Sequence, residues 1–147
     1  MKLEGQHHFM AARADVWEML NDPDMLARAI PGCKRLVPVG EDQYEMAIEL
    51  GVAAIKGTYH GQTEILDKRT LDSYTLHIAA EGPTGTVDAT AHIRLEDTGD
   101  GTLAVYSGEA QIGGLVAGVG QRILSGVAKM VVGQFFKTMG QLLKEAV

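Results

Sequence analysis

The chain has 147 residues, 46% of them apolar, and a formal net charge of −6. This length fits a single domain over residues 1–147 with one hydrophobic core, and the acidic balance excludes the broadly basic surface expected of a nucleic-acid-binding protein. No apolar run reaches the roughly 18 residues of a membrane span, and the N-terminus lacks the layout of a signal peptide. Because the single cysteine, Cys33, cannot form an internal disulfide, we expect a cytoplasmic protein.

The first fifth of the chain predicts a strand and two short helices. Apolar and polar residues alternate over residues 2–10, which favours a strand, and apolar residues at helical spacing favour a helix over 12–20. Pro23 fits the first turn of a second helix over 23–29. Since a residue that precedes proline disfavours helical geometry, this helix should end before Pro31.

The middle of the chain predicts six strands joined by short turns. Turn-forming segments, such as Gly40-Glu41-Asp42 and Gly99-Asp100-Gly101, separate stretches of alternating apolar residues. The predicted strands span residues 34–39, 43–51, 52–66, 71–81, 86–96 and 102–112. Because the connections are short, we expect consecutive strands to pair in one antiparallel sheet.

One long helix should close the chain. Residues 115–145 contain no proline and carry apolar residues at helical spacing, which predicts a helix of about 45 Å. A strand, two helices, six strands and a long C-terminal helix form the α+β outline of a helix-grip domain, in which a curved antiparallel sheet wraps around the helix. The 18 glycines and the low aromatic content of 5% favour a cavity between sheet and helix, although tight backbone packing would explain them equally well.

Strand alternation predicts which side chains face the last helix. All four tyrosines of the chain fall on the inward phase, and tyrosine suits an apolar pocket that has a few hydrogen-bonding points. The predicted ligand-binding residues are Tyr44, Met46, Tyr59, Tyr74, Leu76, Tyr106, Ile123, Val127 and Met130. The alternative is that the tyrosines are ordinary core residues whose hydroxyls bond to the backbone.

A basic face is predicted on the last helix, where four basic residues fall within about 80° of each other on the helical wheel. They are Arg122, Lys129, Lys137 and Lys144. Since Glu145 is the only acidic residue after position 112, residues 113–147 carry +3 of the total charge of −6, which leaves −9 on the rest. We expect this face, with Phe136 on a neighbouring apolar edge, to bind an anionic membrane or an acidic partner. A solvated polar face and a bent helix with a packed end are the alternatives.

Residues with catalytic or metal-binding spacing are not evident. No nucleophile lies in a recognisable arrangement with a base, and His60, His77 and His92 fall on outward strand positions without the spacing of zinc ligands. His7 falls on an inward position, where it is either a polar group of the pocket or a satisfied core residue. We therefore expect no catalytic turnover, no bound metal and no resident cofactor.

Several motifs are more specific than these periodicities. The most specific are Ile30-Pro31-Gly32-Cys33 and the helix that runs from Gly113-Gly114-Leu115 to Phe135-Phe136. Weaker ones are Leu3-x-Gly5, Val16-Trp17-x-x-Leu20-Asn21-Asp22-Pro23, Gly57-x-Tyr59-x-Gly61 and Tyr106 in the last strand. Over nearly its whole length the chain resembles the family of the carbon monoxide dehydrogenase G subunit, a branch of the START-like helix-grip superfamily.

The resemblance implies a non-catalytic accessory protein that recruits or couples a molybdenum hydroxylase of the carbon monoxide dehydrogenase type to the inner face of the cytoplasmic membrane. A lipophilic ligand in the cavity, such as a quinone, would connect that enzyme to respiration. The alternative is a START-like enzyme of the cyclase or dehydratase type that acts on a small hydrophobic substrate in the same cavity. A neighbouring gene for a molybdopterin hydroxylase would favour the first interpretation.

Overall fold

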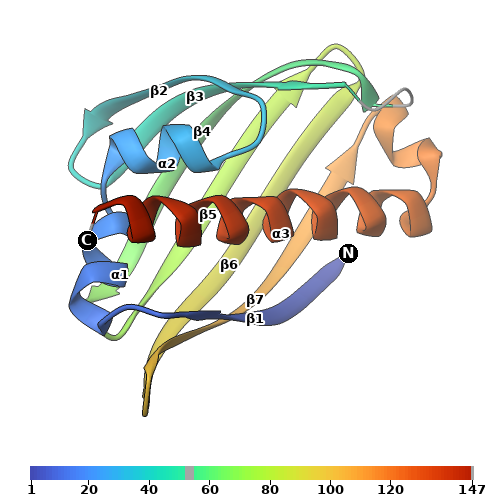
Figure 1. Ribbon diagram of the computed structural model, residues 1–147. Helices are drawn as coiled ribbons and strands as arrows, with labels where there is room; N and C mark the ends of the chain where they lie inside the picture. Colours follow the sequence, from blue (N-terminus) through green and yellow to red (C-terminus); the bar gives the residue numbers. More distant parts are fainter. Residues whose placement is uncertain (52–54, 147) are drawn as a thin grey trace.

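A single antiparallel sheet curves around a long C-terminal helix in the computed structural model, which describes residues 1–51 and 55–146 (Figure 1). The elements are β1 (Lys2–Phe9), α1 (Arg13–Leu20), α2 (Pro23–Ala29), β2 (Cys33–Gly40), β3 (Gln43–Leu50), β4 (Gly57–Arg69), β5 (Ser73–Gly82), β6 (Gly85–Thr98), β7 (Gly101–Gly113), the short 3-10 helix η2 (Leu115–Val119) and α3 (Gln121–Ala146). This order confirms the predicted α+β helix-grip fold.

The seven strands follow the order β1-β7-β6-β5-β4-β3-β2, and every neighbouring pair is antiparallel. Hairpins join β2 through β7, as their short connections predicted. The first strand closes the sheet at the other edge, where Lys2 lies opposite Glu109 and Phe9 opposite Thr102. The three α-helices all lie on the same side of the sheet (Figure 1).

Local sequence signals account for the start of α2 and for the turn that follows it. The Asp22 side chain caps α2 by accepting a hydrogen bond from the Asp24 backbone N–H at 2.9 Å, and Pro23 occupies the first turn. After α2 the chain reverses through Gly32, whose φ of +74° is readily adopted only by glycine. A Cβ atom at this position would also collide with the backbone carbonyl of Glu49.

The last helix begins later than predicted. α3 starts at Gln121 rather than at 115, because residues Leu115–Val119 form the separate turn η2. Gly120 joins the two with a φ of +104°, which interrupts right-handed helical geometry. The 26 residues of α3 span about 39 Å. Apolar periodicity continues across this break, so the sequence pattern does not reveal it.

The fourth predicted strand also begins later. β4 starts at Gly57, whereas Ile55 lies in a 3-10 turn and Lys56 outside any regular element. Residues 52–54 of the predicted strand lie outside the described residues. The inward phase predicted for the last strand is confirmed, because Ala104 is fully buried in β7.

The hydrophobic core lies at one end of the molecule, where α1 and α2 cover the sheet. The C-terminal half of α3 contributes Phe136, Met139 and Leu143, all buried. Other buried members are Phe9, Val16, Trp17, Met19, Leu20, Ala29, Tyr44, Ile65, Tyr74, Ile93, Leu95 and Ala104. The sheet extends past this core toward η2.

Candidate functional site

Two of the four tyrosines belong to the packed core. Tyr74 is 4% exposed, and its ring meets Trp17 edge-on with a centroid separation of 5.6 Å. Burial raises the pKa of the Tyr74 hydroxyl, and burial together with the charge of Asp42 raises the pKa of Tyr44. Both hydroxyls therefore remain neutral at physiological pH.

The other two tyrosines each lie over a glycine of a neighbouring strand. The Tyr59 ring occupies the space above Gly82, and its hydroxyl donates to the Ile55 carbonyl at 2.8 Å and lies 2.7 Å from the Thr84 hydroxyl. The Tyr106 ring lies over Gly5. Tyr59 therefore matches the alternative of a core tyrosine bonded to the backbone.

On α3, two predicted ligand-binding residues face away from the sheet. Ile123 is 50% exposed and Met130 is 44% exposed, whereas Val127 is half-buried. The prediction placed Ile123 and Met130 on the sheet-facing side because it followed the N-terminal half of the helix. In the structure, the face of α3 that packs on the sheet is instead the one that carries Phe136, Met139 and Leu143. The ligand-binding role of the predicted set stays a prediction.

Burial on the inner face falls toward η2 along β3, β6 and β7, but not along β4, where Tyr59 is buried. In β3, Tyr44 and Met46 are buried, but Ile48 and Leu50 remain partly exposed. The inward residues of β6 follow the same gradient from Leu95 to partly exposed members, which are Ala91, Ala89 and Val87. In β7 the partly exposed members are Tyr106, Gly108, Ala110 and Ile112. Along β3, β6 and β7, the inner face toward η2 is therefore apolar and incompletely covered.

His7 stands near the boundary between the packed and the open part of this inner face. Its ring packs edge-on against Phe9 at 4.7 Å and stacks on Phe136 at 5.6 Å between centroids. Desolvation and the neighbouring His8 lower the pKa of His7, so the ring is neutral at pH 7. Among the described residues, no side chain forms a hydrogen bond or ion pair with His7.

The basic residues of α3 are exposed, as predicted, but Phe136 is not. Arg122, Lys129, Lys137 and Lys144 are all exposed and form no ion pair within the described chain. Phe136 is 3% exposed and stacks on Tyr106 at 5.0 Å, so its assignment to a membrane-binding edge is wrong. Its aromatic ring fills the core between α3 and β1.

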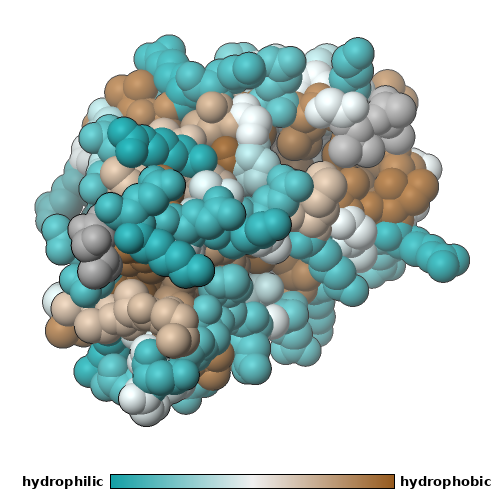
Figure 2. Space-filling model, viewed as in Figure 1, coloured by the Kyte–Doolittle hydropathy of each residue, from teal (hydrophilic) through white to brown (hydrophobic). Residues whose placement is uncertain are grey.

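Exposed apolar groups occur elsewhere near this surface. Leu115 in η2 is 81% exposed, and Figure 2 shows an apolar area at the end of the molecule where η2 lies. Hydrophilic side chains cover the front of the C-terminal half of α3 in the same view (Figure 2). The apolar area at η2 and the hydrophilic cover of α3 are visible in the same view (Figure 2).

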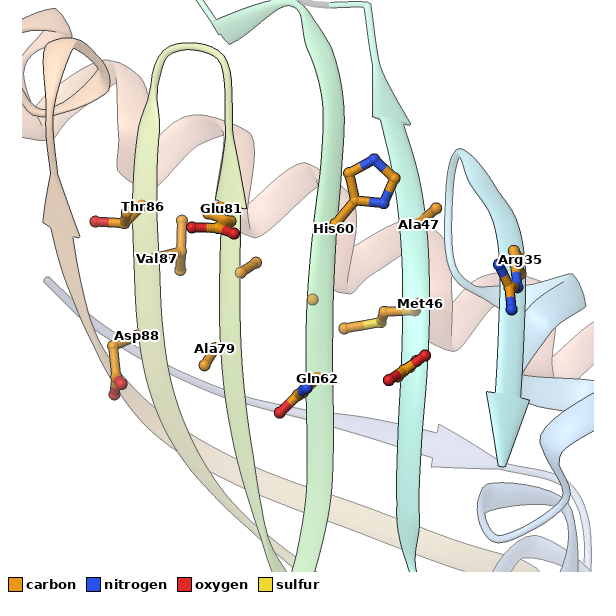
Figure 3. Close-up of a pocket in the computed structure, with 13 residues that line it drawn as sticks. Arg35, Met46, Ala47, His60, Gln62, Ala79, Glu81, Thr86, Val87 and Asp88 are labelled. Carbon is orange, nitrogen blue, oxygen red and sulfur yellow. The ribbon is translucent and has the colours of Figure 1, made fainter. Parts of the chain in front are cut away.

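A hollow of about 650 Å³ lies on the opposite face of the sheet, away from α3 (Figure 3). Ala47 and Ala79 leave gaps in two cross-strand rows of polar side chains. The polar lining comprises Arg35, Glu45, His60, Gln62, Glu81, Thr86 and Asp88. Sequence reasoning did not find this hollow, and alanines at outward strand positions were its only signal. Its mixed charges do not suit a lipophilic ligand.

The described residues were also compared with the requirements of a metal site and of a membrane-spanning helix. Within residues 1–51 and 55–146, no group of three or more potential protein ligands is arranged to hold a metal ion. None of the described helices is long and apolar enough to cross a membrane.

Burial raises the pKa of the Cys33 thiol, whose Sγ lies 3.5 Å from the Arg35 carbonyl, so this thiol is not activated as a nucleophile.

A family model for CoxG, the G subunit of carbon monoxide dehydrogenase, matches residues 5–144. The chain belongs to the CoxG family. The match includes the Pro-Gly-Cys turn after α2 and most of α3, and it confirms the resemblance seen in the sequence. None of the curated proteins compared with the CoxG chain is significantly similar to it in sequence.

Solved structures share the fold of this CoxG chain. A conserved protein of Geobacillus kaustophilus is 35% identical with a TM-score of 0.96, and the match covers 99% of this chain and 97% of that one. A protein of Thermus thermophilus is 13% identical with a TM-score of 0.74, covering 99% of both chains. A protein of Mycobacterium smegmatis is 16% identical with a TM-score of 0.74, covering 99% and 92%. The last two show similarity of fold alone.

Proposed function

We propose that this CoxG protein is a non-catalytic accessory protein that binds a lipophilic ligand of the quinone class between the sheet and α3. The observation that carries the proposal is the burial gradient of the inner face. Apolar side chains such as Ile48, Val87 and Ile112 point inward yet remain partly exposed. A bound lipophile would remove this apolar surface from water, which contributes about 0.8 kcal/mol per buried methylene group.

Few polar groups border this apolar region. His7 and Tyr106 lie where the packed core gives way to the partly exposed face, and a carbonyl-bearing ring could accept hydrogen bonds there. The absence of a described hydrogen-bond partner for His7 supports a binding role over general acid–base catalysis, which requires a positioned and activated group. We therefore propose that the protein has no turnover of its own.

The family suggests the partner, and the charge of α3 suggests the site of contact. We propose that the protein recruits a molybdenum hydroxylase of the carbon monoxide dehydrogenase type to the cytoplasmic membrane from the cytoplasmic side. The exposed basic residues of α3 would contact anionic lipid headgroups peripherally. The amount of a carbon monoxide dehydrogenase-type hydroxylase in the membrane fraction, measured in cells that contain or lack this protein, tests the coupling.

A pair of adjacent residues provides the test of ligand binding. Ala89 points inward and is half-buried, whereas Thr90 points outward and is exposed. Ala89→Trp should cover part of the partly exposed inner face and weaken binding of a short-chain ubiquinone at least tenfold, measured by titration calorimetry. Thr90→Trp is the matched control and should bind like the parent protein.

Both variants must first show the parent circular dichroism spectrum and a cooperative thermal transition. Equal affinity of folded Ala89→Trp and Thr90→Trp would overturn binding at the inner face. No binding by the parent protein would reject the quinone class.

A further inference from the structure

A second hollow lies between α3 and the turn that joins α2 to β2. It encloses about 480 Å³ and is lined on one side by residues 27–33 and on the other by side chains of α3. The turn contains the Ile30-Pro31-Gly32-Cys33 motif, to which neither the core nor the ligand-binding face assigns a role. The hollow is thus built from the most distinctive loop sequence of the chain.

The backbone of this turn is held in one shape. Gly32 adopts a φ of +74° and lies directly against the backbone of Glu49, whose N–H donates to the Gly32 carbonyl at 2.8 Å. The Cys33 N–H donates to the Ile30 carbonyl at 3.2 Å. Because these contacts fix the loop to β3, the wall of the hollow is formed before any ligand arrives.

Two basic side chains and no acidic one line the hollow. Arg28 comes from the last turn of α2 and Lys137 from α3, and both are exposed. Neither forms an ion pair within the described residues. Cys33 is also part of the lining, but burial raises its thiol pKa, so it adds no negative charge at pH 7. The net charge of the lining is therefore positive.

Neutral hydrogen-bonding groups complete the lining. Gln134, Thr138 and Gln141 project from α3 and make no side-chain hydrogen bond to the described residues. Two amides, one hydroxyl, a guanidinium and an ammonium supply many donors. Charge-assisted donors of this kind favour phosphate oxygens, and a guanidinium can bind them through two parallel hydrogen bonds.

We propose that this hollow is a phosphate-binding site, in which Arg28 and Lys137 neutralise the charge and the side chains of Gln134, Thr138 and Gln141 complete the coordination. The partial negative charge at the end of α2 could stabilise Arg28 alone. That interaction does not account for Lys137 or for the unpaired amides. The proposal goes beyond the proposed function and does not depend on a lipophilic ligand.

Inorganic phosphate is the probe for the experiment. Titration at constant ionic strength, followed by 1H–15N NMR, should produce saturable shifts of the side-chain amides of Gln134 and Gln141 and of the Gly32 backbone amide. Arg28→Gln and Lys137→Gln should each weaken binding at least tenfold. Lys2→Gln is the matched control, because Lys2 is an exposed base on β1 outside both the hollow and the basic face of α3, and it should bind like the parent protein.

Non-saturating shifts, or an equal loss of affinity in Lys2→Gln, would overturn the site and indicate general charge screening. Vesicles of phosphatidylcholine with phosphatidic acid then distinguish the source of the phosphate. Weaker cosedimentation of Arg28→Gln than of the parent protein with these vesicles assigns a lipid headgroup, because Arg28 lies in the hollow but outside the basic face of α3. Equal cosedimentation assigns a soluble phosphate compound; both results require the site. Ala89→Trp should leave the phosphate titration unchanged, which separates this test from that of the lipophilic ligand.

Discussion

The surroundings of each tyrosine decide what its hydroxyl can do. The Tyr59 hydroxyl donates to the Ile55 carbonyl just before its own strand and contacts Thr84 in the turn between β5 and β6. Tyr74 lies in the core beside Trp17. Tyr106 stacks on Phe136 next to the partly exposed inner face. Inward orientation is therefore common to all four, but only Tyr106 is itself partly exposed beside the region that a ligand would occupy.

Burial of Tyr74 makes stability sensitive to alkaline pH. Its pKa is raised above the ordinary value of 10.0 by desolvation, so above about pH 10 the unfolded chain loses this proton while the folded chain retains it. The free energy of unfolding should fall by up to about 1.4 kcal/mol per pH unit. In urea unfolding between about pH 9 and pH 11, the free energy of unfolding should decrease less steeply with pH for Tyr74→Phe than for the parent protein. An unchanged slope in that variant would contradict the assignment.

Two halves of α3 have different roles. The C-terminal half packs Phe136, Met139 and Leu143 into the core, whereas Ile123 and Met130 in the preceding half remain largely exposed. Glycines occur at positions 126 and 133, where an added Cβ would meet no atom of the described residues within 4 Å apart from the adjoining backbone of α3. Packing within the protein therefore does not require these glycines.

Replacing the open glycines of α3 should stabilise the protein. Gly126→Ala and Gly133→Ala should each raise the free energy of unfolding by about 0.5–1 kcal/mol, because glycine costs conformational entropy in a helix interior. Gly32→Ala should lower it, since φ is positive and the Glu49 carbonyl blocks a Cβ atom. Chemical denaturation measures all three. A loss of stability in both helix variants would show that these positions are in contact with something other than solvent.

On the scale of the whole molecule, charge is distributed unevenly. Residues 113–147 carry +3 and the rest carries −9. α3 carries four exposed basic side chains, and the turn η2 with its exposed Leu115 directly precedes this helix. This arrangement is typical of a surface that associates reversibly with anionic lipid.

Binding to anionic vesicles should depend on the basic face and on salt. Each basic residue near such a surface contributes about 1 kcal/mol, or about 4 kcal/mol for four, and added salt should weaken binding because screening acts over about 8 Å at physiological ionic strength. The test variant carries glutamine at the four basic positions of α3, which are Arg122, Lys129, Lys137 and Lys144. The control variant has the same net charge, because glutamine replaces four basic residues elsewhere, which are Lys2, Lys34, Lys56 and Arg94. Cosedimentation should decrease markedly more in the test variant. An equal decrease would indicate that net charge, not this face, controls binding.

The sequence by itself determined the order of the elements, the antiparallel sheet and the inward phase of the strands, because alternation and turn chemistry are local properties. The capped start of α2 at Asp22 was equally readable. Only the tertiary structure decided which side of α3 is buried, since apolar residues surround that helix and contacts with α1, α2 and β1 set its rotation. It also decided the break at Gly120, which the continuing apolar periodicity does not reveal. Finally, it placed Arg28 and Lys137 around one hollow, because packing alone brings residues so distant in sequence together.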